Sequence, residues 1–470
     1  MKKYITTVLK NRKTNGHLWF RSLLIFVCCS TFLLSCSDFV EVELPSSQLN
    51  ADDIFTDISS ANAAMASIYA EMRDGSMVSD LSYQMGNYAD ELDYYGSMAS
   101  DTEDFNKNTV ISSNGTIKSW WNTAYNLIYS ANSILERVEN SKQLSTSDCN
   151  QLKGEALFVR AYLHFYLAQL YGAVPYVTTT NYSENAKVVK IPVDQLYLNV
   201  LEDLKVAEGL LGLEYVNPNR TRPNRGVVKA LMARIYLYTD QWEAAAQAAS
   251  YCINNTGTYT WNTNLNTLFL KDNTTTIWQW SPEFEGQNTN EGQAFIFFSV
   301  PPGNVALNPE LVASFETNDL RLDGWIKGLS DGETTWYYAY KYKEQGGTDV
   351  SREYSVIFRL AEQYLIRSEA RVQNGDIEGG VSDLNKIRNR AGLSEVGVTD
   401  KATLLKLILE ERRHEYFTEL GHRFFDLKRT EQLDTVLGVK PGWNTTDRIL
   451  PLPEDELLIN PNLEPQNKGY

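Results

Sequence analysis

Aromatic and polar side chains occur together in two long stretches of the sequence with little helical periodicity, at about 84–115 and 255–350. Sugars present flat C–H faces that pack on aromatic rings, and their hydroxyl groups bond to carboxylate, amide and guanidinium groups. Loops carried by a rigid scaffold are also where binding residues concentrate. The candidate ligand-binding residues are Asn87, Asp93, Tyr94, Tyr95, Phe284, Trp325 and Trp336. For each ring, core packing is the alternative interpretation, because Trp and Tyr are common in protein cores.

The sequence gives little support for catalysis or for a metal site. His414 begins a pattern similar to a helical zinc motif, but Thr418 stands where that motif requires its second histidine. The sequence holds neither a P-loop nor a G-x-G-x-x-G fingerprint. The adjacent acids at 410–411 could suggest a glycosidase pair, but the arginines at 412–413 favour structural ion pairs on a helix. We therefore expect no enzyme activity, no metal and no cofactor.

The N-terminal segment has the pattern of a bacterial lipoprotein signal. Basic residues without any acid precede the apolar stretch 23–34, which is shorter than the roughly 20 residues of a membrane-spanning helix. The sequence Leu-Leu-Ser-Cys at 33–36 resembles a lipobox, whose cysteine is acylated and becomes the new N-terminus. We expect removal of residues 1–35, a stable lipid anchor on Cys36 and a single body of residues 36–470. The alternative is an ordinary export signal with a chance cysteine.

The net charge and the later cysteines narrow the possible functions. The formal net charge is −16 at pH 7, so binding of nucleic acid through phosphate neutralisation is not expected. Anionic lipid would also repel such a chain, which leaves membrane attachment to the lipid on Cys36. Cys149 and Cys252 are the only later cysteines, and their apolar helical surroundings favour two buried thiols. A disulfide formed in an oxidising compartment is the alternative.

Helical periodicity runs through most of the remaining chain. The segment 229–254 predicts a helix, a tight turn and a second helix, with small and aromatic residues spaced as in tetratricopeptide repeats. The segment 362–392 predicts another such pair, with Gly375 in its turn. Strand-like patterns are short, at 276–282 and 333–343. We therefore predict a mainly α fold, in which tetratricopeptide-like helical pairs form a scaffold with long irregular loops and a few short strands.

Six motifs in one order along the chain give it a resemblance to the SusD/RagB family of outer-membrane lipoproteins from Bacteroidetes-type bacteria. The first four are LFVRAYLHFYLAQLYGAVPY (157–176), NRGVVKALMARIYLY (224–238), RLAEQYLIRSEAR (359–371) and LNKIRNRAGL (384–393). The two most specific are EERRHEYFTELGHRFFDLKR (410–429) and the tail LPLPEDELLINPNLEPQNKGY (450–470). The tail departs from the family pattern only by Pro465, inserted before Gln466. The resemblance covers nearly the whole chain from Cys36 onward.

The resemblance implies a nutrient-binding protein rather than an enzyme. Members of the family are held by their lipid at the outer surface of the outer membrane, over a SusC-like TonB-dependent transporter. They bind a glycan, or in some members a peptide, and help to deliver it into that transporter. Their ligand site is typically made from loops in the two stretches described above. A cell-surface glycan-binding lipoprotein is therefore the leading hypothesis, and a peptide-binding member or a structural lid with little ligand affinity are the alternatives.

Overall fold

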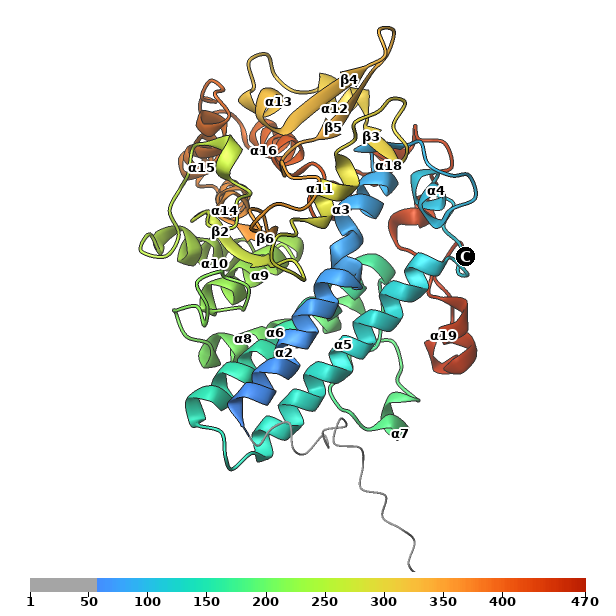
Figure 1. The fold of residues 1–470 in the computed structure, drawn as a ribbon, viewed down its shortest axis with the longest axis vertical. Helices are drawn as coiled ribbons and strands as arrows, with labels where there is room; N and C mark the ends of the chain where they lie inside the picture. The colour runs from blue at the N-terminus through green and yellow to red at the C-terminus, as the bar shows by residue number, and fades with distance from the viewer. Residues whose placement is uncertain (1–56) are drawn as a thin grey trace, which may run out of the picture. The chain divides into compact units, whose positions relative to one another are not determined.

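The computed structural model describes residues 57–470, which belong to one compact unit (Figure 1). The export signal and Cys36 lie outside the described residues, so cleavage and lipid attachment stay predictions. Helices dominate and strands are few and short, which confirms the predicted mainly α fold. Within residues 57–470, no helix combines the length and the apolar character that crossing a membrane requires.

Eight helices of the described chain form a scaffold in which each packs on the next (Figure 1). They are α5 (Gly115–Asn140), α6 (Thr146–Tyr171), α8 (Val193–Leu210), α9 (Arg225–Tyr238), α10 (Trp242–Asn254), α14 (Leu360–Gln373), α15 (Ile377–Arg390) and α16 (Lys401–Tyr416). This order confirms the predicted helical pairs at 229–254 and 362–392. α10 packs directly on α14, although the segment 255–359 separates them in the sequence. The scaffold is therefore continuous in space, and this segment is an excursion from it.

Local signals set the ends of the long buried helix α6. Its first turn is capped by Ser145, whose Oγ accepts the backbone N–H of Asp148 at 3.2 Å. Its last turn ends at Gly172, which has a φ of 75° that suits glycine. Cys149 on α6 and Cys252 on α10 are free thiols, so the disulfide alternative is wrong. The Cys252 thiol is instead fully buried and donates to the carbonyl of Gly226 at 3.3 Å.

Two small antiparallel sheets connect segments that are far apart in the sequence. The first contains β1 (Leu92–Tyr94), β3 (Val305–Leu307), β5 (Thr335–Ala339) and β4 (Ile326–Ser330), in that spatial order. The second pairs β2 (Thr276–Trp280) with β6 (Ser355–Arg359). β2 and β5 confirm the strands predicted at 276–282 and 333–343. Because β1 pairs with β3, the first sheet joins the two stretches that the sequence singled out for ligand binding.

The stretches expected to be irregular contain several short helices. α3 (Met77–Tyr88) runs into the first stretch and α4 (Asp101–Asn106) lies within it, while α11 (Asn290–Phe295), α12 (Pro309–Ala313) and α13 (Leu320–Trp325) lie in the second. Each of α4, α11, α12 and α13 has an N-cap side chain that accepts a first-turn N–H. Helices of five or six residues are too short to show periodicity, so they were missed. The other described helices are α2 (Ile58–Asp74), α7 (Tyr182–Asn185), α17 (His422–Arg429), α18 (Leu433–Leu437) and α19 (Glu454–Ile459).

A second hydrophobic core holds the four-stranded sheet on the scaffold. Its buried members include Leu92 of β1, Leu307 of β3, Trp325 at the end of α13 and Phe417 just after α16. Beside this core, the carboxylate of Glu415 accepts hydrogen bonds from three buried arginines, Arg321, Arg359 and Arg390. This arrangement confirms the structural ion-pair network expected for the C-terminal helices.

Candidate ligand-binding site

The four-stranded sheet turns one face toward the second core and the other face away from it. Side chains alternate between the two faces of a strand. The paired positions on the core face are Leu92, Leu307 and Tyr337. The next position along each strand lies on the opposite face, which places Asp93 of β1 with Trp336 and Tyr338 of β5. These three side chains are partly exposed.

Four aromatic residues meet at this outward face, and we call them the aromatic platform: Tyr95, Phe297, Trp336 and Tyr338. The Trp336 side chain lies close enough to the Tyr95 hydroxyl to oppose the rise in the pKa of Tyr95. The Phe297 ring packs against Tyr338, with centroids 4.9 Å apart and an interplanar angle of 62°. Tyr95 is 41% exposed, and the other three rings are partly exposed. The platform therefore offers ring faces on which the C–H face of a sugar can pack.

Polar groups at the edge of the platform could bond to hydroxyl groups of a ligand. The Asp93 carboxylate is oriented by Asn308, whose Nδ2 donates to Asp93 Oδ1 at 3.0 Å. Burial, with the negative charge of Asp93, raises the pKa of Tyr95, so its hydroxyl keeps its proton at neutral pH. The platform thus combines two hydrogen-bonding groups with its apolar ring faces, which is the composition expected of a ligand site with few but defined polar contacts.

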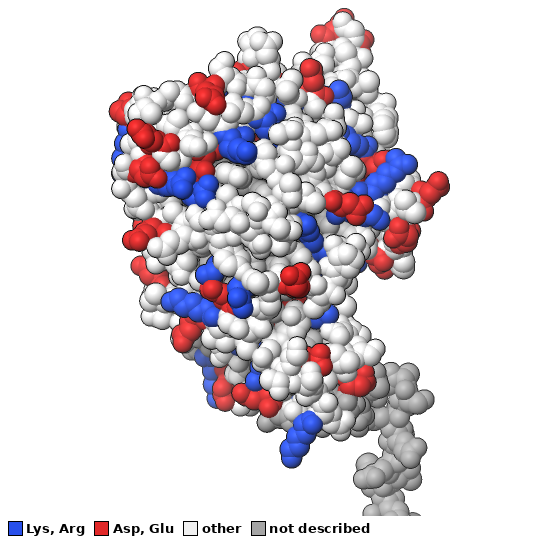
Figure 2. Space-filling model, turned by 90° about the vertical axis from the view of Figure 1, so that its left-hand side faces the viewer, with Lys and Arg blue, Asp and Glu red and all other residues white. Residues whose placement is uncertain are grey.

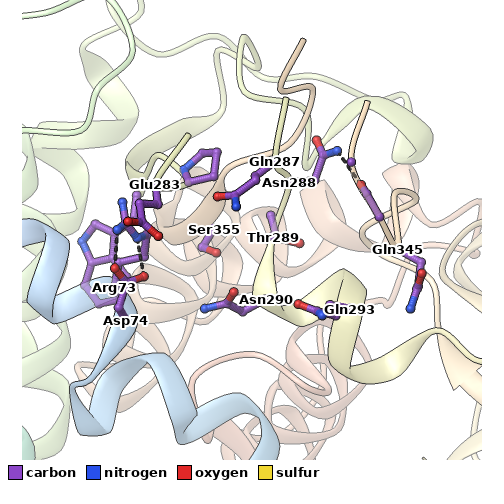
Figure 3. A pocket seen from close by; sticks show the side chains of 14 residues that line it. Arg73, Asp74, Glu283, Gln287, Asn288, Thr289, Asn290, Gln293, Gln345 and Ser355 are labelled. Carbon is purple, nitrogen blue, oxygen red and sulfur yellow. Dashed lines mark hydrogen bonds and ion pairs between the residues drawn. The ribbon is translucent and has the colours of Figure 1, made fainter. Parts of the chain in front are cut away.

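A separate pocket of about 340 Å³ lies where α2, β2, α11 and β6 approach one another (Figure 3). Its lining residues are Arg73, Asp74, Trp280, Pro282, Glu283, Gln287, Asn288, Thr289, Asn290, Gln293, Gln345, Gly346, Gly347 and Ser355. We call it the amide pocket because five of its side chains are Asn or Gln. Asn288 holds its two loops together, since its Nδ2 donates to the Gly346 carbonyl at 2.9 Å and its Oδ1 accepts from the N–H of Arg352 at 2.9 Å.

Two of the predicted site residues are buried, and their direct contact with a ligand is therefore wrong. Trp325 is 0% exposed in the second core, where its Nε1 donates to the carbonyl of Leu265 at 3.1 Å. Asn87 is also 0% exposed, and its Nδ2 donates to the carbonyl of Tyr83 at 2.9 Å within α3. Both residues support the elements around the platform instead of presenting a surface to a ligand.

The remaining predicted residues have different surroundings. Tyr95, Trp336 and Asp93 come together at the platform. Tyr94 points to the core side of the sheet, and its hydroxyl bonds to the Ser100 Oγ at 2.7 Å. Phe284 is 61% exposed on the loop that carries Glu283 and Gln287 of the amide pocket. It therefore lies on a loop of the amide pocket without lining it, and it is not a member of the platform.

Two platform residues were missed in the sequence. Tyr338 stands two positions after Trp336 in a predicted strand, so the alternation of side chains could have placed both on one face. Phe297 follows the short helix α11 and reaches the platform only through the tertiary fold, so no local signal marks it.

Replacing Trp325 with phenylalanine should lower stability without affecting ligand affinity. The change removes the hydrogen bond to Leu265 and leaves a small cavity in the second core, at a cost of about 1–3 kcal/mol in the free energy of unfolding. Urea denaturation and calorimetric titration of the same preparation would measure both quantities. A large loss of affinity with unchanged stability would return Trp325 to the ligand site.

The described residues show no geometry for nucleophilic catalysis. The sequence GLSDG at 328–332 matches the letters of a G-x-S-x-G motif, but Ser330 ends a strand of the β4–β5 hairpin rather than a strand-to-helix turn. Its Oγ donates to the carbonyl of Thr334 at 2.8 Å. The histidines of the described chain, His164, His414 and His422, are all buried. Burial lowers the pKa of both His164 and His414 to about 3, so neither is placed to act as a base on a bound substrate.

Glu91, the residue before β1, should make stability depend on pH. Burial, with the charge of Asp90, raises its pKa to about 8, against opposing effects of the Thr418 N–H and of Arg423 and Lys341. Between its ordinary pKa of 4.5 and about 8, the folded protein therefore holds a proton that the unfolded chain has released. Rising pH in that window favours unfolding.

We accordingly expect Glu91→Gln to gain stability relative to the wild type as pH rises from about 5 to 8. Urea denaturation of both proteins at several pH values would measure this difference. Parallel pH profiles for the two proteins would contradict it, and a difference that grows toward acid would reverse its sign.

On the face shown in Figure 2, Lys and Arg side chains lie among Asp and Glu side chains. Binding of a nucleic-acid backbone generally needs basic residues gathered in a patch or stripe. This face therefore offers no such patch, in keeping with the net charge of −16.

Comparison with known proteins identifies the class of protein that this scaffold and sheet define. Residues 38–237 match a family model described as starch-binding and associating with the outer membrane, and residues 324–470 match the model of the SusD family. The two matches together cover well over half of the chain. The chain belongs to the SusD/RagB family of carbohydrate-binding proteins, which confirms the resemblance found in the sequence.

Individual relatives align with this chain over nearly their whole length. The SusD-like protein P2 of Formosa agariphila is 25% identical, over 95% of this chain and 99% of its own. A SusD superfamily protein from Bacteroides vulgatus has the same fold, with a TM-score of 0.78, 23% identity, and coverage of 88% of this chain and 99% of its own. A laminarin-binding SusD-like protein aligns with a TM-score of 0.74 and 23% identity, over 88% of this chain and 99% of its own.

Proposed function

We propose that the protein is a cell-surface glycan-binding lipoprotein that captures oligosaccharide or polysaccharide and passes it to a SusC-like TonB-dependent transporter. The observation that carries this proposal is the aromatic platform. Tyr95 and Trp336 come from distant parts of the chain, yet the pairing of β1, β3 and β5 brings them together on a partly exposed sheet face. Ring faces beside an oriented carboxylate suit the C–H faces and the hydroxyl groups of a sugar. The laminarin-binding protein of similar fold supports a glycan rather than a peptide.

The proposed role is binding, without catalysis. Within the four strands of the sheet, Asp93 is the only carboxylate, whereas glycoside hydrolysis generally needs two carboxyl groups flanking the bond. Release of shortened products from a glycan by the purified protein would overturn this part of the proposal.

The proposed anchor is a lipid on Cys36 after removal of residues 1–35. Replacement of Cys36 with alanine should release the protein from the outer membrane into a soluble fraction. Labelling with a fatty-acid analogue should be lost in the same variant. Retention of the label after this substitution would contradict the anchor.

The proposed partner is a SusC-like transporter. An affinity tag at the C-terminus of the lipidated protein should co-purify a large outer-membrane barrel protein from native membranes in mild detergent. Absence of such a protein, in preparations where the tagged protein is intact and folded, would contradict the partnership.

Calorimetric titration of residues 37–470 against polysaccharides, oligosaccharides and peptides tests the binding function. Saturable heat with a glycan class would support the proposal. Heat with peptides alone would make the protein a peptide-binding member of the family. Silence across the whole panel from a well-folded protein would favour a structural lid with little ligand affinity.

A further inference from the structure

The amide pocket contains hydrogen-bonding groups that the fold does not use. Trp280 is 4% exposed, and its Nε1 has no partner among the described residues. Within residues 57–470, the side-chain amides of Asn290, Gln293 and Gln345 make no hydrogen bond either, and Figure 3 shows Asn290 and Gln293 side by side at the lower wall of the pocket. The Nε1 atom itself is closed off from the pocket, whereas the amides of Asn290 and Gln293 are exposed and free to bond to a ligand. The fold thus leaves several neutral amide groups of the pocket free to bond to a ligand with several hydroxyl groups.

The charges of the pocket disfavour an anionic ligand. Arg73 is the only cation of its lining, and the guanidinium is engaged by the adjacent Asp74, with Arg73 Nε donating to Asp74 Oδ1 at 2.5 Å. Arg73 Nη1 also donates to the carbonyl of Ser281 at 3.1 Å. The exposed carboxylate of Glu283 has no cationic partner among the described residues, so the lining carries a surplus negative charge. A carboxylate or sulfate entering this pocket would lose hydration without gaining a free cation.

The volume and the lining suit one sugar unit better than a peptide segment. A volume of about 340 Å³ lies at the small end of the range of roughly 300–1,000 Å³ for ligand pockets. Trp280 and Pro282 are the only large apolar residues of the lining, so there is little surface for apolar peptide side chains. Amide groups both donate and accept, and can therefore bond to the several hydroxyl groups of a neutral sugar.

The helix α11 connects the amide pocket with the aromatic platform. Asn290 and Gln293 of α11 line the pocket, and Phe297 of the platform follows two residues after the helix ends. A helix of six residues is roughly 9 Å long, so α11 spans about the length of a few sugar units between its pocket residues and Phe297. A glycan that spans this distance can engage both sites and gain affinity from both.

We propose that the amide pocket binds one neutral sugar unit of the glycan held on the platform, and that the protein thereby selects neutral glycans over those bearing uronate or sulfate groups. This inference rests on the glycan-binding function proposed above. The selection arises from neutral amide groups that are free of protein partners and from the absence of a free cation in the lining.

The first test compares glycans on the intact soluble body, residues 37–470. Neutral glucan, xylan and mannan hexasaccharides would be titrated beside oligogalacturonate and sulfated carrageenan oligosaccharides. We expect the tightest neutral ligand to bind at least tenfold more tightly than either charged class. The double variant Asn290→Ala/Gln293→Ala should bind that neutral ligand about tenfold more weakly, because two hydrogen bonds are lost. Equal or tighter binding of the charged classes, or wild-type affinity of the double variant, would overturn the inference.

A charge reversal provides the second test. Glu283→Lys should raise the affinity for oligogalacturonate about tenfold, because it places a free cation in the lining. Glu214→Lys is the matched control, since Glu214 is exposed between α8 and α9 and the change in net charge is the same. An equal gain in both variants would mean a general charge effect and would overturn the assignment to the pocket.

These tests separate failure of the pocket from failure of the function. If Trp336→Ala abolishes binding of the neutral ligand while the pocket variants bind normally, glycan binding stands and the pocket inference falls. If the pocket variants lose affinity for peptides but keep their affinity for the neutral glycan, the pocket inference also falls. If the wild type binds no glycan, the proposed function and the pocket inference fall together.

Discussion

Trp336→Ala is expected to weaken binding of the glycan ligand about thirtyfold or more. The substitution removes the indole face from the platform and its interaction with the Tyr95 hydroxyl. Aromatic anchors of this kind contribute about 2 kcal/mol or more at binding sites, which corresponds to that loss of affinity. Because the side chain is partly exposed on the outward face of β5, the melting temperature should change by no more than about 2 °C. Calorimetric titration and thermal denaturation would measure the two effects.

The matched control removes an exposed aromatic ring elsewhere. Tyr129 is 51% exposed on α5 and lies outside the platform and the amide pocket, so Tyr129→Ala should retain full affinity. The double variant Tyr95→Ala/Trp336→Ala should lose less affinity than the sum of the two single losses, since the residues act through a shared contact. Wild-type affinity in Trp336→Ala would place the glycan elsewhere on the surface.

Local patterns in the sequence predicted the scaffold well but only part of the site. Helical periodicity and the turn at Gly375 depend on residues close together in the chain, so the pairs at 229–254 and 362–392 could be predicted. The packing of α10 on α14 is different, because the whole excursion 255–359 lies between these helices. Local periodicity cannot predict that two helices so far apart in the sequence pack against each other.

The same distinction explains the two tryptophans of the candidate site. Trp325 and Trp336 lie in one aromatic stretch and look alike in the sequence. Trp336 is on the outward face of β5, whereas Trp325 ends α13 and fills the second core at 0% exposure. The difference follows from the pairing of β4 with β5 and of β3 with β5, and register between strands is a tertiary property. The partnership of Tyr95 with Trp336 depends on the same register.

The excursion also accounts for the composition of the site. A helical scaffold presents ridges and grooves of side chains, whereas a flat platform of rings needs the alternation of a strand. The segment 255–359 supplies β3, β4 and β5 of the sheet and α11 beside it, and β1 completes the sheet from another part of the chain. The sheet must therefore be held firmly against the scaffold for the rings to keep their arrangement.

Glu415→Gln should be among the most destabilising single substitutions, at about 3–5 kcal/mol in the free energy of unfolding. Burial opposes ionisation of Glu415, but Arg390, Arg359 and Arg321 outweigh it and hold the pKa of the carboxyl well below its usual range. Arg321 also pairs with Glu411, and Arg359 with Glu419, but Glu415 is the sole carboxylate partner of Arg390 in the described chain. A neutral amide would leave that guanidinium buried without its counter-charge.

Glu410→Gln provides the control on the same helix. Its side chain is 52% exposed and lies 3.8 Å from Arg413, so its loss should change stability by no more than about 0.5 kcal/mol. Urea denaturation would measure both variants. Because the folded-state pKa of Glu415 is lowered, its contribution is fully present above the unfolded value near 4.5 and is lost only in stronger acid. The large difference should therefore be constant between about pH 5.5 and 8, and a small or pH-dependent difference in that range would show that the excursion is held to the scaffold by other contacts.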